Sequence, residues 1–193
     1  MTPLQAPEPL RIDVAGLVKR SVASLYSHLV TRPTGRAVRL AIESQLAEAG
    51  EPSVSLVDFS QVTILDFSCA DEVVARLLSR YSGADRPRDA FFVFRGVQEW
   101  HEEPIQVVLE RQSLAAVTQV ADGSFRLLGT VDPSEVRVWE RVEALQEVPP
   151  DSAGETFAEE DDRTVLEQLV HRRLVFREPG GGLHALTHLL GGV

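Results

Sequence analysis

The sequence predicts an α/β protein, and three observations carry that prediction. Nearly continuous apolar runs at residues 54–59 and 90–94 are typical of strands buried on both faces. Segments with apolar residues at helical spacing lie before, between and after these runs. Turns rich in Gly, Pro and Asp separate the segments. Strands that alternate with helices in this way form a layered α/β structure.

The composition limits the possible classes of protein. Hydrophobic residues make up 44% of the 193 residues and charged residues 25%, as in an ordinary globular protein. The formal charge of -10 disfavours non-specific attraction to nucleic acid or to an anionic membrane. Cys69 is the one cysteine, which fits a reducing compartment. The chain shows neither a secretory signal nor an apolar run that could span a membrane, so we expect a cytoplasmic protein without membrane contact.

The first part of the chain reads as alternating strands and helices. Residues 1–9 hold three prolines and predict a flexible tail. We expect strands at 10–14, 54–59 and 90–94, and helices at 18–30, 35–49, 71–81 and 97–112. Thr34 is the expected N-cap of the second helix, and Pro104 marks a break or a first turn in the last one.

The last third of the chain has a different pattern. Two hairpins are expected, one around Asp122-Gly123 and one around residues 178–182. Helices are expected at 133–145, with Asp132 as the N-cap, and at 161–173. We place a domain boundary near Gln112, which divides the chain into an α/β domain at 10–112 and a small α+β module at 113–193.

The most informative segment is a polar, acidic cluster between an apolar run and a helix. Its members are Asp66, Ser68, Cys69, Asp71 and Glu72. One hypothesis makes Ser68 the helix N-cap, with Asp71 completing a capping box. The other makes Ser68 a phosphorylation or partner-binding site, because a phosphate adds about -1.5 to -2 charges. The helix dipole would stabilise that charge, and the neighbouring carboxylates would repel it.

These residues resemble the core of STAS domains, the fold of anti-sigma factor antagonists. The likeness rests on Val57-Asp58-Phe59-Ser60-Gln61-Val62, on Ile64-Leu65-Asp66-Phe67-Ser68, and on Ser68-Cys69-Ala70-Asp71-Glu72, which matches a Ser-Phe-Ala-Asp-Glu subgroup except at Cys69. It covers residues 10–120, and Ser68 falls where the family carries its phosphorylatable serine. The resemblance implies a STAS-like mixed sheet with helices and a regulator that works by partner switching. It also implies an anti-sigma-type serine kinase as the partner.

The C-terminal module resembles the end of a winged-helix domain. The expected helix at 161–173 ends in the basic pair Arg172-Arg173, and a Gly-rich hairpin would form the wing. An alternative function is therefore a DNA-binding transcription regulator whose phosphate contacts would come from Arg163, Arg172, Arg173 and Arg177. The acidic run at 159–162 and Glu167 would face the same phosphates and oppose such binding.

Catalytic signatures are scarce. The sequence lacks the glycine-rich loops that bind nucleotides. His184 and His188 have an i,i+4 spacing, but the sequence offers no evident third metal ligand, so we expect neither metal nor cofactor. Cys69 fits a small buried residue, with a nucleophilic cysteine as the alternative. The main prediction is a non-catalytic regulator with a protein partner, and Asp66, Ser68, Asp71 and Glu72 form its predicted binding surface.

Overall fold

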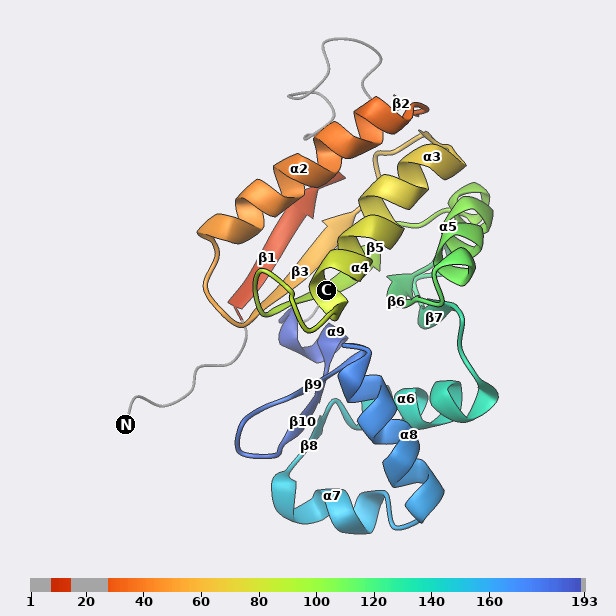
Figure 1. Cartoon of the computed structure of the whole chain (residues 1–193). Coiled ribbons are helices and arrows are strands. Elements are labelled where there is room, and N and C mark those ends of the chain that lie inside the picture. The colour runs from red at the N-terminus through yellow and green to blue at the C-terminus, as the bar shows by residue number, and fades with distance from the viewer. Residues whose placement is uncertain (1–7, 15–27, 192–193) are drawn as a thin grey trace.

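The computed structural model, which describes residues 8–14 and 28–191, contains a five-stranded sheet (Figure 1). Its order is β1 (Glu8–Asp13), β3 (Ser53–Asp58), β5 (Ala90–Arg95), β6 (Ala115–Gln119) and β7 (Phe125–Gly129). The first four strands are parallel, and β7 is antiparallel to β6. The predicted α/β class is confirmed.

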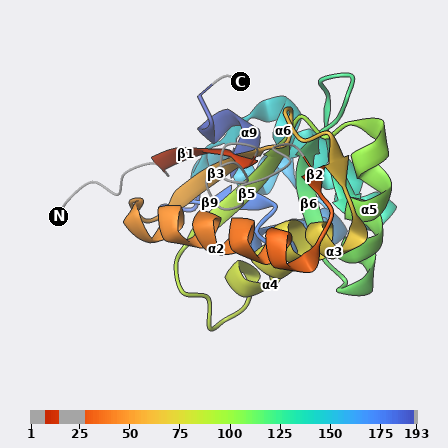
Figure 2. The ribbon, with the colours of Figure 1, turned by 90° about the horizontal axis from the view of Figure 1, so that it is seen from above.

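Helices of the first part of the chain cover one face of this sheet (Figure 2). They are α2 (Arg32–Glu48), a continuous helix made of α3 (Phe67–Ala70), the π-helical η1 (Asp71–Arg76) and α4 (Leu77–Ser82), and α5 (Glu99–Arg111). The parallel strands follow one another across the sheet in chain order. Because crossovers between parallel strands are right-handed, the helices that connect such strands all lie on the same face. Beside α3, the short strands β2 (His28–Leu29) and β4 (Ile64–Leu65) pair in parallel.

Several element boundaries differ from the expectation. Helix α2 begins at Arg32, and Thr31 rather than Thr34 is its N-cap, because the Thr31 side chain accepts a hydrogen bond from the Thr34 backbone. Helix α5 continues through the buried Pro104 without a break. The helix expected at 18–30 lies outside the described residues, except that its last part contains β2.

The C-terminal third folds into a second, smaller unit. It consists of α6 (Pro133–Leu145), β8 (Glu147–Val148), α7 (Pro150–Thr156), α8 (Glu160–His171), β9 (Val175–Arg177), β10 (Leu183–Ala185) and α9 (Leu186–Leu189). Its three strands form an antiparallel sheet in the order β8-β10-β9. Both expected hairpins are present, and Asp132 caps α6 in a capping box with Glu135.

The two units share the central sheet. Strands β6 and β7 extend this sheet to Gly129, beyond the boundary expected near Gln112. Along β5, Phe92 and Phe94 face the helix layer, while Phe91 and Val93 pack against the C-terminal unit. This alternation explains why the run is apolar throughout, since both faces of the strand are buried. Among residues 8–14 and 28–191, no helix has the length and hydropathy that a membrane span needs.

Candidate functional site

The turn that leads from β4 into α3 is closed by Asp66. Its carboxylate accepts hydrogen bonds from the backbone nitrogen of Cys69 at 2.8 Å and from the hydroxyl of Ser68 at 2.9 Å. Asp66 is therefore the N-cap of the helix. The hypothesis that Ser68 is the cap is wrong, because Ser68 is the second helical residue and donates its hydroxyl to the cap.

The acidic residues one turn further on are paired with arginines. Asp71 accepts hydrogen bonds from Arg32 at 2.5 Å, Arg76 at 2.9 Å and the side chain of Gln112 at 2.9 Å. Burial by itself would raise the pKa of Asp71, but the hydrogen bonds from Arg32 and Arg76 outweigh it, and the pKa lies below its usual value. Asp71 is thus held as a carboxylate between α2, η1 and α5.

Glu72 is the buried centre of this ion-pair network. Only 3% of it is exposed, and its carboxylate lies 3.1 Å from a guanidinium nitrogen of Arg32 and 3.1 Å from Nε of Arg39. A buried carboxylate that loses its partners costs about 3–5 kcal/mol. Asp71 and Glu72 therefore hold η1 against α2 instead of presenting free negative charge to a partner.

The network borders an open groove of about 690 Å³ between α2 and η1. Four arginines line this groove, namely Arg32, Arg36, Arg39 and Arg76, and Arg36 alone among them has no acidic partner among the described residues. The sequence reasoning missed the arginines of α2. Their spacing at positions 32, 36 and 39 marks one helical face, and this signal could have matched them to the acidic pair at 71–72.

Exposed apolar side chains lie on the helix that carries Ser68 and on the elements next to it. Val30, Ile64, Phe67 and Trp100 are 43–61% exposed. They lie on or beside β2, β4, α3 and α5; β2 pairs with β4, and α5 contacts both β4 and α3. This end of the molecule, at the top of Figure 1, is where β2 and α3 meet. We call Ile64, Phe67, Ser68 and Trp100 the Ser68 face.

Cys69 lies beneath this face and is fully buried. Its thiol donates a hydrogen bond to the backbone oxygen of Thr31 at 2.9 Å. Burial and the nearby Asp66 carboxylate raise the pKa of Cys69 to about 12. A nucleophilic cysteine needs a lowered pKa and access to substrate. This environment therefore favours the small buried residue over the nucleophile.

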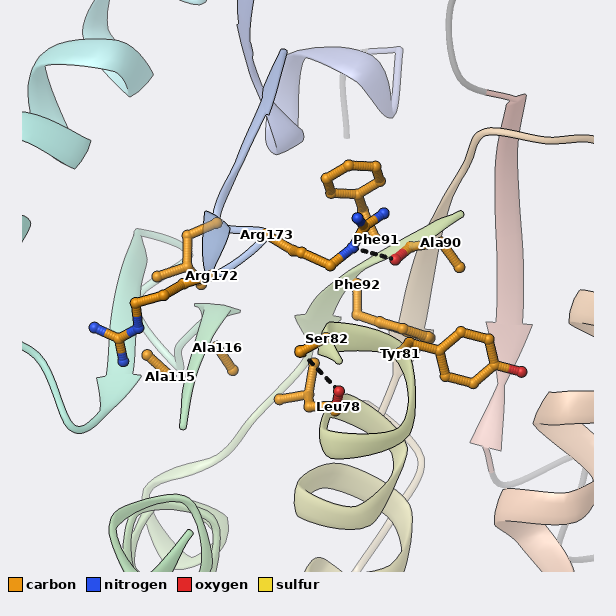
Figure 3. A pocket seen from close by; sticks show the side chains of 11 residues that line it. Leu78, Tyr81, Ser82, Ala90, Phe91, Phe92, Ala115, Ala116, Arg172 and Arg173 are labelled. Carbon is orange, nitrogen blue, oxygen red and sulfur yellow. Dashed lines mark hydrogen bonds between the residues drawn. The ribbon is translucent and has the colours of Figure 1, made fainter. Parts of the chain in front are cut away.

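Three of the four arginines considered for nucleic acid make contacts within the protein. Arg173 bonds the backbone oxygen of Ala90 and the carboxylate of Asp89, and its guanidinium lies 3.8 Å from the centre of the Phe91 ring. Figure 3 shows Arg173 reaching toward β5 while Arg172 points away from it. The space that these side chains enclose is about 10 Å³, room for a single water and too small for a substrate.

The remaining arginines of this set differ in their surroundings. Arg172 bonds Glu135 and the backbone oxygen of Thr130. Arg177 forms a bidentate pair with Glu167, at 2.8 and 2.6 Å. Arg163 is exposed and has no side-chain partner among the described residues. Residues 130–191 contain 13 acidic residues and six arginines. This charge balance opposes contact with phosphates.

One further group of side chains has the composition of a metal site. Glu147, His184 and His188 place one possible ligand atom each within 4.8 Å of one another. The sequence indicated the two histidines but not Glu147, because its position depends on the pairing of β8 with β10.

Comparisons with known proteins identify no relative. No family model, no curated protein and no solved structure matches the chain.

Proposed function

We propose that the protein is a non-catalytic regulator that binds a protein partner through the Ser68 face. One observation carries this proposal: the Ser68 hydroxyl is bonded to the helix cap Asp66, and exposed apolar side chains lie on the same helix and on the neighbouring β4 and α5. Isolated exposed apolar residues are common, but several gathered at one end of a molecule are typical of a protein interface.

Modification of Ser68 would change this face directly. A phosphate on Ser68 would bring about -1.5 to -2 charges next to the Asp66 carboxylate that now accepts the hydroxyl proton. Repulsion between the two groups would disturb the cap, while the helix N-terminus would attract the phosphate. Either response alters the shape and charge of the Ser68 face without unfolding the domain. This supports a two-state switch.

The resemblance to STAS domains supplies the class of partner. It implies an anti-sigma-type serine kinase that binds the unmodified face and leaves it after phosphate transfer to Ser68. In this proposal, Asp66 and Ser68 form the switch. Asp71 and Glu72 act indirectly, because their ion pairs fix the helix that carries Ser68.

The C-terminal unit takes a different part in the proposal. Its order of helix, strand, two helices and a hairpin supports a winged-helix-like module. Its arginine contacts and its excess of acidic residues favour packing against the sheet over DNA binding. We infer that this module completes the regulator and contributes protein contacts.

The test is affinity capture from cells of the source organism with the full-length protein. The compared variants are wild type, Ser68→Ala, Ser68→Glu and the control Ser79→Glu, which places the same charge on an exposed residue of α4. We expect one partner that wild type, Ser68→Ala and Ser79→Glu retain and Ser68→Glu loses. With the purified partner, Ser68→Glu should lower the affinity at least tenfold, about 1.4 kcal/mol.

Intact-mass analysis of the recovered wild-type protein complements the capture. A phosphate located on Ser68 would support the kinase partner. Recovery of the same proteins by all four variants, together with an unmodified mass, would reduce Ser68 to a structural hydrogen-bond donor and reject the proposal.

A further inference from the structure

The base of the C-terminal hairpin brings together two imidazoles and a carboxylate from three elements. Glu147 begins β8, His184 lies opposite it on β10, and His188 follows on α9. One possible ligand atom from each lies within 4.8 Å of the others. The two histidine rings are nearly parallel, with an interplanar angle of 5° and centroids 6.5 Å apart.

His184 has a ring nitrogen that is available to bind an ion. Nδ1 of His184 is buried and has no hydrogen-bond partner among the described residues. Buried polar atoms nearly always have a hydrogen-bond partner or a ligand, so the unpaired nitrogen indicates a bound group at this place. The other ring nitrogen, Nε2, lies 3.7 Å from a carboxylate oxygen of Glu178. A metal-bound histidine commonly has such a carboxylate beside it, which orients the ring.

Gly182 lies next to the Glu178 side chain in the hairpin loop. A Cβ on Gly182 would collide with the Glu178 carboxylate. The glycine therefore leaves the room that the carboxylate occupies next to His184. Gly182 thus allows the Glu178 carboxylate to lie beside the cluster.

We propose that Glu147, His184 and His188 bind one divalent transition-metal ion of the zinc class, with Glu178 as the carboxylate that orients His184. Two imidazoles and a carboxylate are ligands that zinc uses in proteins. Tetrahedral bonds of about 2.1 Å require ligand atoms about 3.4 Å apart. Glu147 and His188 are exposed, so their side chains have room to rotate toward the ion.

The ion would add a link between elements of the C-terminal unit that lie around the hairpin base. It would tie β8 and β10 to α9, which contacts β5 of the central sheet. The site is therefore structural, and it stabilises the docked C-terminus. It does not depend on the proposed function of the Ser68 face, because α3 lies at the top of Figure 1 and β10 and α9 lie well below it.

The test is calorimetric titration of the full-length protein, free of any histidine tag, with zinc chloride after treatment with a chelator. The variants are His188→Ala and Glu147→Gln, which change exposed ligands and leave the core intact. The matched controls are His171→Ala and Glu140→Gln, exposed residues of α8 and α6. Thermal unfolding with and without zinc provides the second measurement.

We expect wild type and both controls to bind one ion per chain and to unfold at a higher temperature with zinc. Both ligand variants should bind at least tenfold more weakly and lose most of the thermal shift. Failure of wild type to saturate at millimolar zinc would overturn the proposal. Equal loss of affinity in the control variants would overturn it as well, because zinc would then bind the surface without a specific site.

Discussion

At the scale of single residues, the hydrogen bonds and ion pairs of each candidate residue indicate its role. Ser68 donates to Asp66, and Arg173 joins the C-terminal unit to Ala90 and Asp89. Glu72 is surrounded by arginines from α2 and η1. Without these partners, the acidic residues would form a free negative patch and the arginines would form a basic surface for DNA. Their pairing instead points to structural roles for Glu72 and Arg173 and leaves Ser68 as the candidate switch.

Cys69 provides a prediction at this scale. Because burial and Asp66 raise its pKa to about 12, the thiol stays protonated through the neutral range and reacts slowly. We expect a thiol reagent at pH 8 to label the native protein at least a hundredfold more slowly than the urea-unfolded protein. Labelling is followed by absorbance, with free cysteine as the reference. Rapid and complete labelling of the native protein would restore Cys69 as a candidate nucleophile.

At the scale of elements, the position of the helix that carries Ser68 depends on close packing between α2 and α3. A Cβ on Gly35 would lie 2.9 Å from the Cα of Cys69 and 3.1 Å from the Cβ of Glu72. The glycine thus permits the approach that brings Arg32 and Arg39 to the acidic pair. Small-to-large changes at such contacts cost about 1–3 kcal/mol.

The prediction at this scale compares two glycines. Gly35→Ala should lower the free energy of unfolding by about 1–3 kcal/mol, since the backbones must separate. Gly154→Ala, in α7, meets nothing within 4 Å and should be neutral or stabilising by up to about 1 kcal/mol. Urea unfolding followed by circular dichroism measures both. Equal stability of Gly35→Ala and wild type would contradict the close helix contact.

At the scale of the whole molecule, the sheet needs a cover on both faces. The helix layer buries Phe92 and Phe94, and the C-terminal unit buries Phe91 and Val93. The second contact is reinforced by Phe176, whose ring lies 5.3 Å from that of Phe91 in an edge-to-face arrangement. The two units should therefore fold as one cooperative body.

The two tryptophans allow a test of this cooperativity. In Trp100→Phe, the buried Trp139 of α6 reports the C-terminal unit alone, while far-ultraviolet circular dichroism reports the whole chain. Trp100 is 61% exposed, so its replacement should cost little stability. We expect the fluorescence and dichroism transitions in urea to coincide. A fluorescence transition at clearly lower urea concentration would show that the C-terminal unit unfolds separately.

The sequence by itself determined the local structure. Continuous apolar runs predicted the buried strands at 54–59 and 90–94, helical spacing of apolar residues predicted the α/β class, and turn residues predicted both hairpins, because each pattern depends on a short segment alone. The polar cluster at residues 66–72 was found correctly after an extended segment, but the helix expected from Asp71 begins at Phe67, so most of the cluster is helical. Capping residues were less certain, as Thr31 and Asp66 show, since several neighbouring polar side chains could satisfy the same backbone groups.

Only the tertiary structure decided which distant residues meet. It added β6 and β7 to the central sheet, paired Glu72 with Arg32 and Arg39, and set Glu147 opposite His184. These contacts join residues that are 33 to 40 positions apart in the ion-pair network. Local propensity carries no information about such pairs, because strand register and helix packing depend on the whole set of buried contacts.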